Sequence, residues 1–164
     1  MYNIKREFYS NLRNIENYKQ VCKQEALYYQ HGTTTVLKHS RNVAFCSLWL
    51  AKKLEKKFNI KFNYNDLIVG AFLHDMFLYD WHVKDKSHRL HGYIHPRIAS
   101  MNAKKICKVN DNVAKIINTH MWPLTLRKIP LSKEAFIVCI VDKYVALKET
   151  FKIAEQIRKV KIFL

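Results

Sequence analysis

The chain has 164 residues, of which 49% are apolar, and it carries a formal net charge of +16 at pH 7. This length suits one domain, and the apolar content is enough for one substantial core. Only three Gly and three Pro occur, so few residues are available for the tight turns of a β-rich protein. We therefore expect an all-α fold in a single domain over 1–164.

The sequence shows no feature of a secreted or membrane protein. The first ten residues mix apolar side chains with Lys5, Arg6 and Glu7, unlike a signal peptide. The longest clear apolar run, Phe136 to Val141, is far too short to span a bilayer. No C-x-x-C pair occurs, which favours reduced, buried thiols at Cys22, Cys46, Cys107 and Cys139. A soluble cytoplasmic protein without membrane contact is expected.

The positive charge attracts anions such as nucleotides or nucleic acids. The lysines are nevertheless spread along the chain, as in Lys52-Lys53 and Lys56-Lys57, with no Gly-rich phosphate loop or aromatic RNA motif beside them. Each such run is interpreted as a solvated helix face. The overall sign favours an anionic small molecule or nucleotide as substrate, while nucleic acid stays open without a motif to indicate it. The oligomeric state does not follow from the sequence.

The first part of the chain reads as two helical regions. One is expected from about Asn3 to Tyr29, ended by His31-Gly32. Thr34 or Thr35 can cap the next helix. Its apolar residues recur every three or four positions on one face that also carries His39, so His39 is expected to face the core.

A third helix is expected to begin near Asn65 or Asp66, with Asp66 at its exposed start, and to run to His74-Asp75. The following segment, Asp80 to Gly92, is rich in His, Lys and Asp. It is the best candidate for a mobile loop over a site.

Three more helices are expected in the remainder. Two shorter ones span about His95 to Cys107 and Asn110 to His120, and Ser132 caps a long last helix. The inward face of the last helix is expected to consist of Phe136, Cys139, Ile140, Tyr144 and Leu147. Asp142 is the exception in this apolar stretch.

Three features place an ionisable group inside an apolar helical segment: His39, the pair His74-Asp75, and Asp142. An unpaired buried carboxylate costs several kcal/mol or more. The two aspartates therefore need a cation or strong donors if they face inward.

This pattern resembles the HD superfamily of metal-dependent phosphohydrolases, which is named for a His, a His-Asp pair and an Asp on successive helices. The matching residues are His39 in K-H-S-R-N-V-A, His74-Asp75 in F-L-H-D, and Asp142 in I-V-D-K-Y. The resemblance covers about 34–150. It implies a compact HD-domain bundle of about six to seven helices, with these four residues as metal ligands.

Two further histidines fit the six-ligand, two-metal members of that superfamily: His95 in H-P-R-I-A and His120 in I-I-N-T-H-M-W. If the helix starts early, His91 can replace His95. The resemblance implies one or two divalent transition ions. Imidazole and carboxylate suit Mn, Fe, Co, Ni or Zn. Asp75, with two oxygens, is the expected bridge, and Asp75 and His74 are the expected catalytic residues.

One position departs from the family. Many HD hydrolases carry Lys three residues after the Asp of the pair, where this chain has Leu78. Either another cation binds the phosphate or the substrate differs. Arg97 and Lys143, next to ligands in sequence, are the candidate cations. His91 is a third substrate-binding candidate. Protonation of the leaving group is open among Asp80, His82 and His88.

The leading hypothesis is hydrolysis of a phosphomonoester or phosphodiester, with a nucleotide as one candidate, by a metal-activated hydroxide. The same ligand set also resembles di-iron members of the superfamily that oxidise small polyols or phosphonates. A third reading is a basic nucleotide- or RNA-binding module with a structural metal. Fold-level resemblance does not separate these alternatives.

Overall fold

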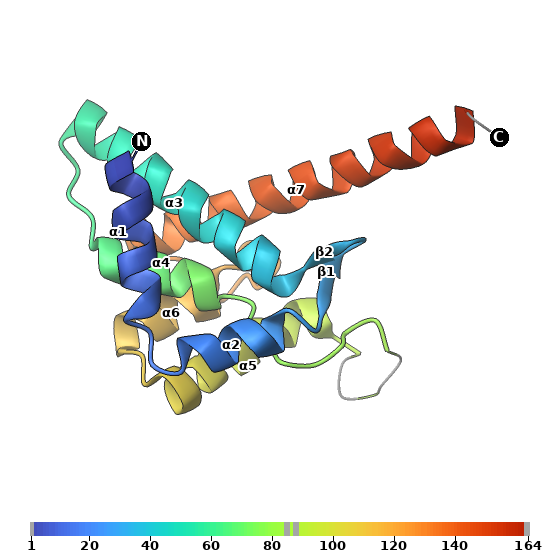
Figure 1. The fold of residues 1–164 in the computed structure, drawn as a ribbon. Coiled ribbons are helices and arrows are strands. Elements are labelled where there is room, and N and C mark those ends of the chain that lie inside the picture. The colour runs from blue at the N-terminus through green and yellow to red at the C-terminus, as the bar shows by residue number, and fades with distance from the viewer. Residues whose placement is uncertain (1, 84–85, 87–88, 163–164) are drawn as a thin grey trace.

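The computed structural model describes residues 2–83, 86 and 89–162. Over these residues the chain forms seven helices and a two-stranded antiparallel sheet (Figure 1), which confirms the expected all-α fold. The elements are α1 Tyr2–Arg13, α2 Tyr18–Glu25, β1 Tyr29–His31, β2 Thr34–Thr35, α3 Val36–Phe58, α4 Tyr64–Leu73, α5 His91–Cys107, α6 Asp111–Thr119 and α7 Lys133–Ile162. No helix in this part of the chain has the length and apolarity needed to cross a bilayer.

Helix α4 lies at the centre of the core. Every residue from Leu67 to Leu73 is buried, and α4 contacts α1, α3, α5, α6 and α7. Gly70 allows the close approach to α6, because a Cβ at this position would lie 2.7 Å from Cγ2 of Ile116. His74 and Asp75 follow directly after α4 and therefore lie deep inside the molecule.

Helix α3 packs against α4 and α7. The Thr35 hydroxyl accepts a hydrogen bond from the amide of Lys38 at 3.3 Å, as expected of an N-cap. His39 is fully buried, which confirms the expected inward face.

The N-terminal region differs from the single long helix that was expected. The chain leaves the helical conformation between α1 and α2, where Asn17 adopts a φ of 58° and its side chain donates to the carbonyl of Ile106 at 2.7 Å. The turn lets both short helices pack on the bundle. After α2 the chain forms the β1–β2 hairpin, with Gly32 at a φ of 54° in its turn.

Asp66 is not at an exposed helix start. Asn63 caps α4 by accepting from the amide of Asp66, and the Asp66 side chain is only 4% exposed. Its carboxylate accepts from the side chains of Asn63 and Asn110. Asn63 and Asn110 are the N-cap residues of α4 and α6. Because both donate to the same carboxylate, Asp66 links the starts of the two helices.

The expected inward face of α7 is wrong for four of its five residues. Cys139 is buried, but Phe136, Ile140, Tyr144 and Leu147 are 48%, 47%, 51% and 58% exposed. Apolar residues occur all round this helix, so periodicity alone did not define its face. Asp142 and Ile140 are two positions apart, about 200° around a helix, and cannot both face inward. Ser132 caps α7 as expected, and its C-terminal half extends away from the other helices (Figure 1).

Candidate metal centre

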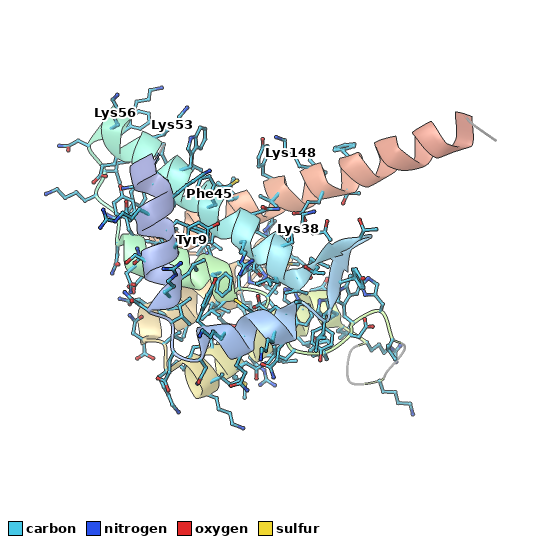
Figure 2. The ribbon with its side chains drawn as sticks, in the orientation of Figure 1. Tyr9, Lys38, Phe45, Lys53, Lys56 and Lys148 are labelled. Atoms are coloured by element: carbon cyan, nitrogen blue, oxygen red, sulfur yellow. The ribbon has the colours of Figure 1, made fainter. Side chains whose placement is uncertain are left out.

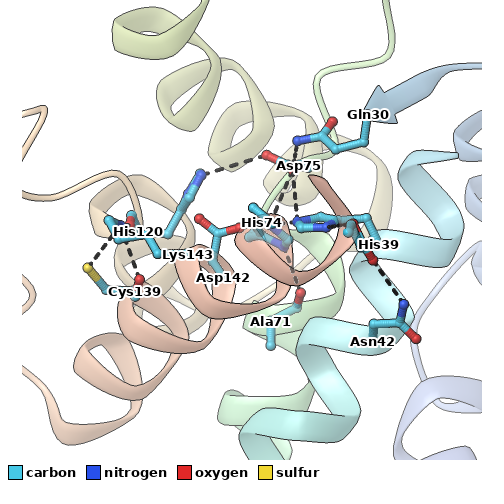
Figure 3. A network of polar contacts seen from close by, with 12 residues as sticks. Gln30, His39, Asn42, Ala71, His74, Asp75, His120, Cys139, Asp142 and Lys143 are labelled. Atoms are coloured by element: carbon cyan, nitrogen blue, oxygen red, sulfur yellow. Dashed lines mark hydrogen bonds and ion pairs between the residues drawn. The ribbon is translucent and has the colours of Figure 1, made fainter. Parts of the chain in front are cut away.

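The structure brings six buried residues together from five helical segments, and Figure 3 labels all of them except His95. We call this group the His–Asp cluster. It consists of His39 on α3, His74 and Asp75 after α4, His95 on α5, His120 after α6, and Asp142 on α7. Each of the six residues as a whole is at most 7% exposed. The six candidate ligands named from the sequence thus lie in one place.

Asp75 lies between the histidines, and its two oxygens face different ones. Oδ2 lies 3.2 Å from Nε2 of His74 and 3.8 Å from Nε2 of His39. Oδ1 lies 3.2 Å from Nε2 of His95 and 3.6 Å from Nε2 of His120. This placement suits the bridging role expected for Asp75.

Asp142 completes the α3–α7 side of the cluster. Its Oδ1 lies 3.1 Å from Nε2 of His39 and 3.4 Å from Nε2 of His74. The ligand atoms of these three residues lie within 4.8 Å of one another, and so do those of His74, Asp75 and His120. Each set is compact enough to hold a metal ion.

The outer nitrogens of three histidines fix the direction of their rings. Each Nδ1 donates to a main-chain carbonyl in the preceding turn, at 2.7–2.8 Å: His74 to Ala71, His95 to His91, and His120 to Ile117. Because a carbonyl only accepts, Nδ1 carries the hydrogen, and Nε2 of the neutral ring offers its lone pair to the cluster.

His39 is held by a carboxylate that the sequence reasoning missed. Its Nδ1 lies 2.8 Å from Oε2 of Glu149, and Asn42 donates to Oε1 of the same carboxylate at 3.0 Å. Glu149 follows Asp142 by seven residues, two turns of α7, and so faces the same way. That spacing was the available signal.

Two observations show that these residues fit a cation. Nε2 of His95 and Nε2 of His120 lie 2.9 Å apart although both rings donate through Nδ1, so two lone pairs face each other when the rings are neutral. Nε2 of His74 and Oδ1 of Asp75 are buried without a hydrogen-bond partner. A cation between these acceptors would satisfy all of them. Imidazole nitrogen and carboxylate oxygen suit divalent transition ions.

The carboxylates of the cluster are held in the ionised form. Burial raises the pKa of Asp75, but the adjacent His74 and His95 outweigh burial and hold that pKa well below its usual range. Burial likewise raises the pKa of Asp142, while the neighbouring imidazoles of His39 and His74 lower it further than burial raises it. Both carboxylates therefore keep their negative charge at neutral pH.

The histidines respond to this charge in opposite ways. Burial lowers the pKa of His39, but its hydrogen bonds to Asp142 and Glu149 raise it to about 9. The pKa of His74 is also raised, against burial, by Asp75 and Asp142. For His120, burial and the neighbouring His74 and His95 lower the pKa to about 3.

His91 lies one turn outside the cluster. Helix α5 starts at His91, earlier than expected, yet His95 is the histidine beside Asp75. The His91 ring stacks on His95 with centroids 4.5 Å apart, and Trp81 stacks on its other side at 5.1 Å. Tyr79 Oη lies 2.9 Å from its Nδ1. Its substrate-binding role stays a prediction.

Among the described residues, no hydrogen bond joins Lys143 or Arg97 to a side chain of the cluster. The Lys143 ammonium donates to the main-chain carbonyls of His120 and Cys139 at 2.9 and 3.1 Å. Arg97 is exposed on α5, where its charge helps to lower the pKa of Lys128 after the larger effect of burial. Lys143 would need to leave these carbonyls to bind a phosphate at the metal centre, and the substrate-binding role of Arg97 stays a prediction.

The segment after the His-Asp pair begins with a strained residue. Leu78 adopts a φ of 60°, rare for a side chain of this size, and packs against the core. Further along, the exposed His82 and Asp80 contact each other at 3.1 Å. His88 lies outside the described residues, so no choice among the three leaving-group candidates follows.

Two residues near the N-terminus also belong to the surroundings of the cluster. Gln30, on β1, donates from Nε2 to Oδ2 of Asp75 at 2.6 Å. Glu25, at the end of α2, is buried with both carboxylate oxygens unpartnered. Burial raises its pKa to about 8, with Asp75 adding to the shift against the opposing charge of His74. No motif in the sequence marked either residue.

A family model described as HD domain matches residues 36–147. The match covers more than half of the chain and contains all six residues of the His–Asp cluster. The chain therefore belongs to the HD domain family, within the superfamily of metal-dependent phosphohydrolases. No curated protein and no solved structure matches the chain. Gln30 and Glu149, which contact the cluster, lie outside the matched segment.

Proposed function

We propose that the protein is a metal-dependent phosphohydrolase that cleaves a phosphomonoester or phosphodiester, with nucleotides as the first substrate class to test. The observation that supports this most is the convergence of four imidazole Nε2 atoms on the two oxygens of Asp75. Membership of the HD domain family supports the reaction class.

The proposed ligands divide into two sides. His39, His74 and Asp142 would hold one ion, and Asp75, His95 and His120 a second, with Asp75 available to both. Four neutral imidazoles and two carboxylates carry −2, so two divalent ions leave a site charge of about +2 that attracts a phosphate. When bound, such ions supply the Lewis acidity that lowers the pKa of a water molecule and neutralises phosphoryl oxygens.

The chain's own residues contribute positioning. Gln30 holds Oδ2 of Asp75, and Glu149 fixes the ring of His39, so both ligands keep their orientation. The net charge of +16 raises the local concentration of an anionic substrate. The stack of Trp81, His91 and His95 places aromatic rings beside the centre, where the edge of a substrate base can pack.

The test is anaerobic purification with elemental analysis, followed by a screen of phosphomonoesters, phosphodiesters and nucleotides. Mn, Fe, Co, Ni, Zn and Mg are added back singly to chelated protein. Phosphate or nucleoside release without O₂, restored by a transition ion and absent from His74→Ala, is the expected result. Substrate-dependent O₂ consumption by the iron-loaded protein, without ester cleavage, would replace hydrolysis by the oxygenase alternative. Binding without turnover would favour the binding module.

A further inference from the structure

The outward face of α3 carries cations at both ends and aromatic rings between them. Its residues follow one another at steps of three or four, which places them on one side of the helix: Lys38, Arg41, Phe45, Trp49, Lys53 and Lys56. We call this the α3 outer face (Figure 2). Phe45 is partly buried and the other five are exposed. From Lys38 to Lys56 the face is about 27 Å long at the helical rise of 1.5 Å per residue.

A hollow of about 500 Å³ opens between α1 and the first half of this face. Its lining includes Lys5, Tyr9, Lys38, Arg41, Asn42 and Phe45, and it contains no carboxylate. The Tyr9 ring is half exposed, and Figure 2 shows it beside Phe45. Three cations and three aromatic rings, the third being that of Phe8, thus surround a space large enough for a nucleobase with its sugar.

The carboxylates around the face already have partners. Glu7 pairs with Lys52 at 2.8 Å, and Glu55 accepts from the hydroxyl of Tyr64. Glu149 is buried against His39. The exposed lysines of the face are therefore not neutralised by these three neighbouring acids.

Cations and rings are interleaved rather than segregated. The ammonium of Lys53 lies 4.1 Å from the ring centroid of Trp49, which is 46% exposed. On neighbouring α7, Lys148 lies 5.1 Å from the exposed ring of Tyr144. A lysine run alone is a solvated surface, whereas rings on which bases stack, flanked by cations that bind phosphates, characterise single-strand binding proteins.

We propose that the α3 outer face and its hollow bind single-stranded nucleic acid. Phosphates bind Lys38, Lys53 and Lys56, and bases stack on Trp49 and in the hollow against Tyr9. A duplex fits poorly, because its bases are paired and stacked on one another and cannot stack on Trp49 or enter the hollow. A free nucleotide shares the chemistry of one unit of the strand but reaches only the hollow.

This site is separate from the metal centre, and the inference does not rest on the proposed hydrolysis. None of the six cluster residues lines the hollow. The nearest link is Asn42, which lines the hollow and donates to Glu149 behind His39. Binding on the α3 outer face is therefore testable whether or not the cluster is catalytic.

The test is fluorescence anisotropy of a labelled oligo(dT) 12-mer at several salt concentrations, with the oligonucleotide shown by gel to stay intact. Lys38→Gln, Lys53→Gln and Lys56→Gln together should weaken binding at least about tenfold and reduce the salt slope by about 2, since each lost phosphate contact contributes about 0.7. Trp49→Ala should weaken binding about fivefold or more and leave the salt slope unchanged, because it removes stacking only.

The matched control removes the same charge elsewhere: Lys105→Gln, Lys108→Gln and Lys115→Gln, exposed on or beside α5 and α6. It should change affinity less than about twofold, with circular dichroism confirming that all variants fold. Equal loss in both triple variants, or equal binding by the Trp49→Ala variant, would overturn the proposal. So would duplex DNA or anionic vesicles binding as tightly as the single strand. If a mononucleotide binds as tightly as the 12-mer, the binding site is the hollow alone, and the proposal that a single strand binds along the α3 outer face is also rejected.

Discussion

The two sides of the His–Asp cluster are built from similar ligands but are held by different groups. On the α3–α7 side, His39 lies between two carboxylates, those of Asp142 and Glu149. On the α5–α6 side, His95 and His120 donate only to main-chain carbonyls. His74 and Asp75 lie between the two sides (Figure 3).

This difference determines whether a histidine on each side carries an extra proton when no metal is bound. Next to its carboxylates, His39 has a pKa of about 9 and keeps a proton at neutral pH. His120, with a pKa of about 3, does not. An ion that binds on the α3–α7 side therefore displaces the proton of His39. It also lies near more negative charge there, because the carboxylates of Asp142 and Glu149 are both on that side. The α5–α6 side presents free lone pairs and only Oδ1 of Asp75 as a nearby charge. We expect a tight first ion on the α3–α7 side and a weaker second ion.

Asp75→Asn should have the largest effect, because both sides share this carboxylate. The amide keeps the shape but removes the charge and replaces one oxygen with a donor, so both ions should be lost or misplaced. Activity should fall by several orders of magnitude, since a metal lowers the pKa of bound water from about 16 to about 7. Metal content and turnover are compared at equal folded concentration.

The control for that variant is Asp111→Asn, on the exposed start of α6, where the carboxylate pairs with Lys104. Asp66 is unsuitable, because its buried carboxylate joins α4 to α6. Near-normal turnover by Asp75→Asn would remove the His–Asp cluster from the mechanism.

Replacing both His95 and His120 by Ala should separate the two sides. The weaker ion should be lost while the first ion stays, so that elemental analysis changes from two ions per chain to one. Isothermal titration of the chelated protein with Mn or Co should show two binding steps in wild type and only the tighter one in the variant. Wild type saturating at one ion would reduce the site to His39, His74, Asp75 and Asp142.

Glu149→Gln should weaken the first ion selectively. The amide can still accept from Nδ1 of His39, but the negative charge that makes the ring a stronger ligand is gone. Loss of such an outer partner typically costs 10- to 100-fold in metal affinity. Titration should show the tight step weakened and the second unchanged, whereas Glu16→Gln, on the surface, should alter neither. Equal weakening of both steps would mean that Glu149 acts on the whole cluster.

The sequence predicted the residues of the cluster better than it predicted the residues that hold them in position. His39, His74, Asp75 and Asp142 stood out because a charged group in an apolar helix needs a partner, and the family resemblance added His95 and His120. Gln30 and Glu149 did not stand out, since a polar residue on a short strand or in the middle of a long helix is ordinary. Their role depends on tertiary contacts across 45 and 110 residues of chain.

In the fold, too, the features set by local interactions were predictable and those set by tertiary contacts were not. Helix caps at Thr35 and Ser132 were predictable from local hydrogen bonding. The break at Asn17 and the orientation of α7 were not, because tertiary packing decides both. In α7 the four exposed apolar residues formed a regular stripe, and only the inward requirement of Asp142 could have excluded that face.

The smallest predicted effect is on the pH dependence of stability in chelated protein, where the two sides should act with opposite sign. His39 has a folded pKa of about 9 against an ordinary 6.5, so its stabilisation is complete below about pH 6.5 and is lost as pH rises toward 9. His120 has a folded pKa of about 3, so the unfolded chain binds more protons below pH 6.5 and stability falls as pH is lowered.

Urea unfolding at pH 4.5, 6.5 and 8.5 checks this with His39→Asn and His120→Asn. In wild type each histidine should lower the free energy of unfolding by about 2 kcal/mol over two pH units, His120 from pH 6.5 to 4.5 and His39 from pH 6.5 to 8.5. His120→Asn should lack the decrease at acid pH, and His39→Asn should lack the decrease at alkaline pH. Glu25, with a pKa of about 8, adds its own slope, but it does so in all three proteins and cancels in the differences. If both variants change the free energy of unfolding over the same pH range, the two histidines titrate as one unit. The different hydrogen-bond partners of His39 and His120, carboxylate and main-chain carbonyl, would then not determine which histidine is protonated.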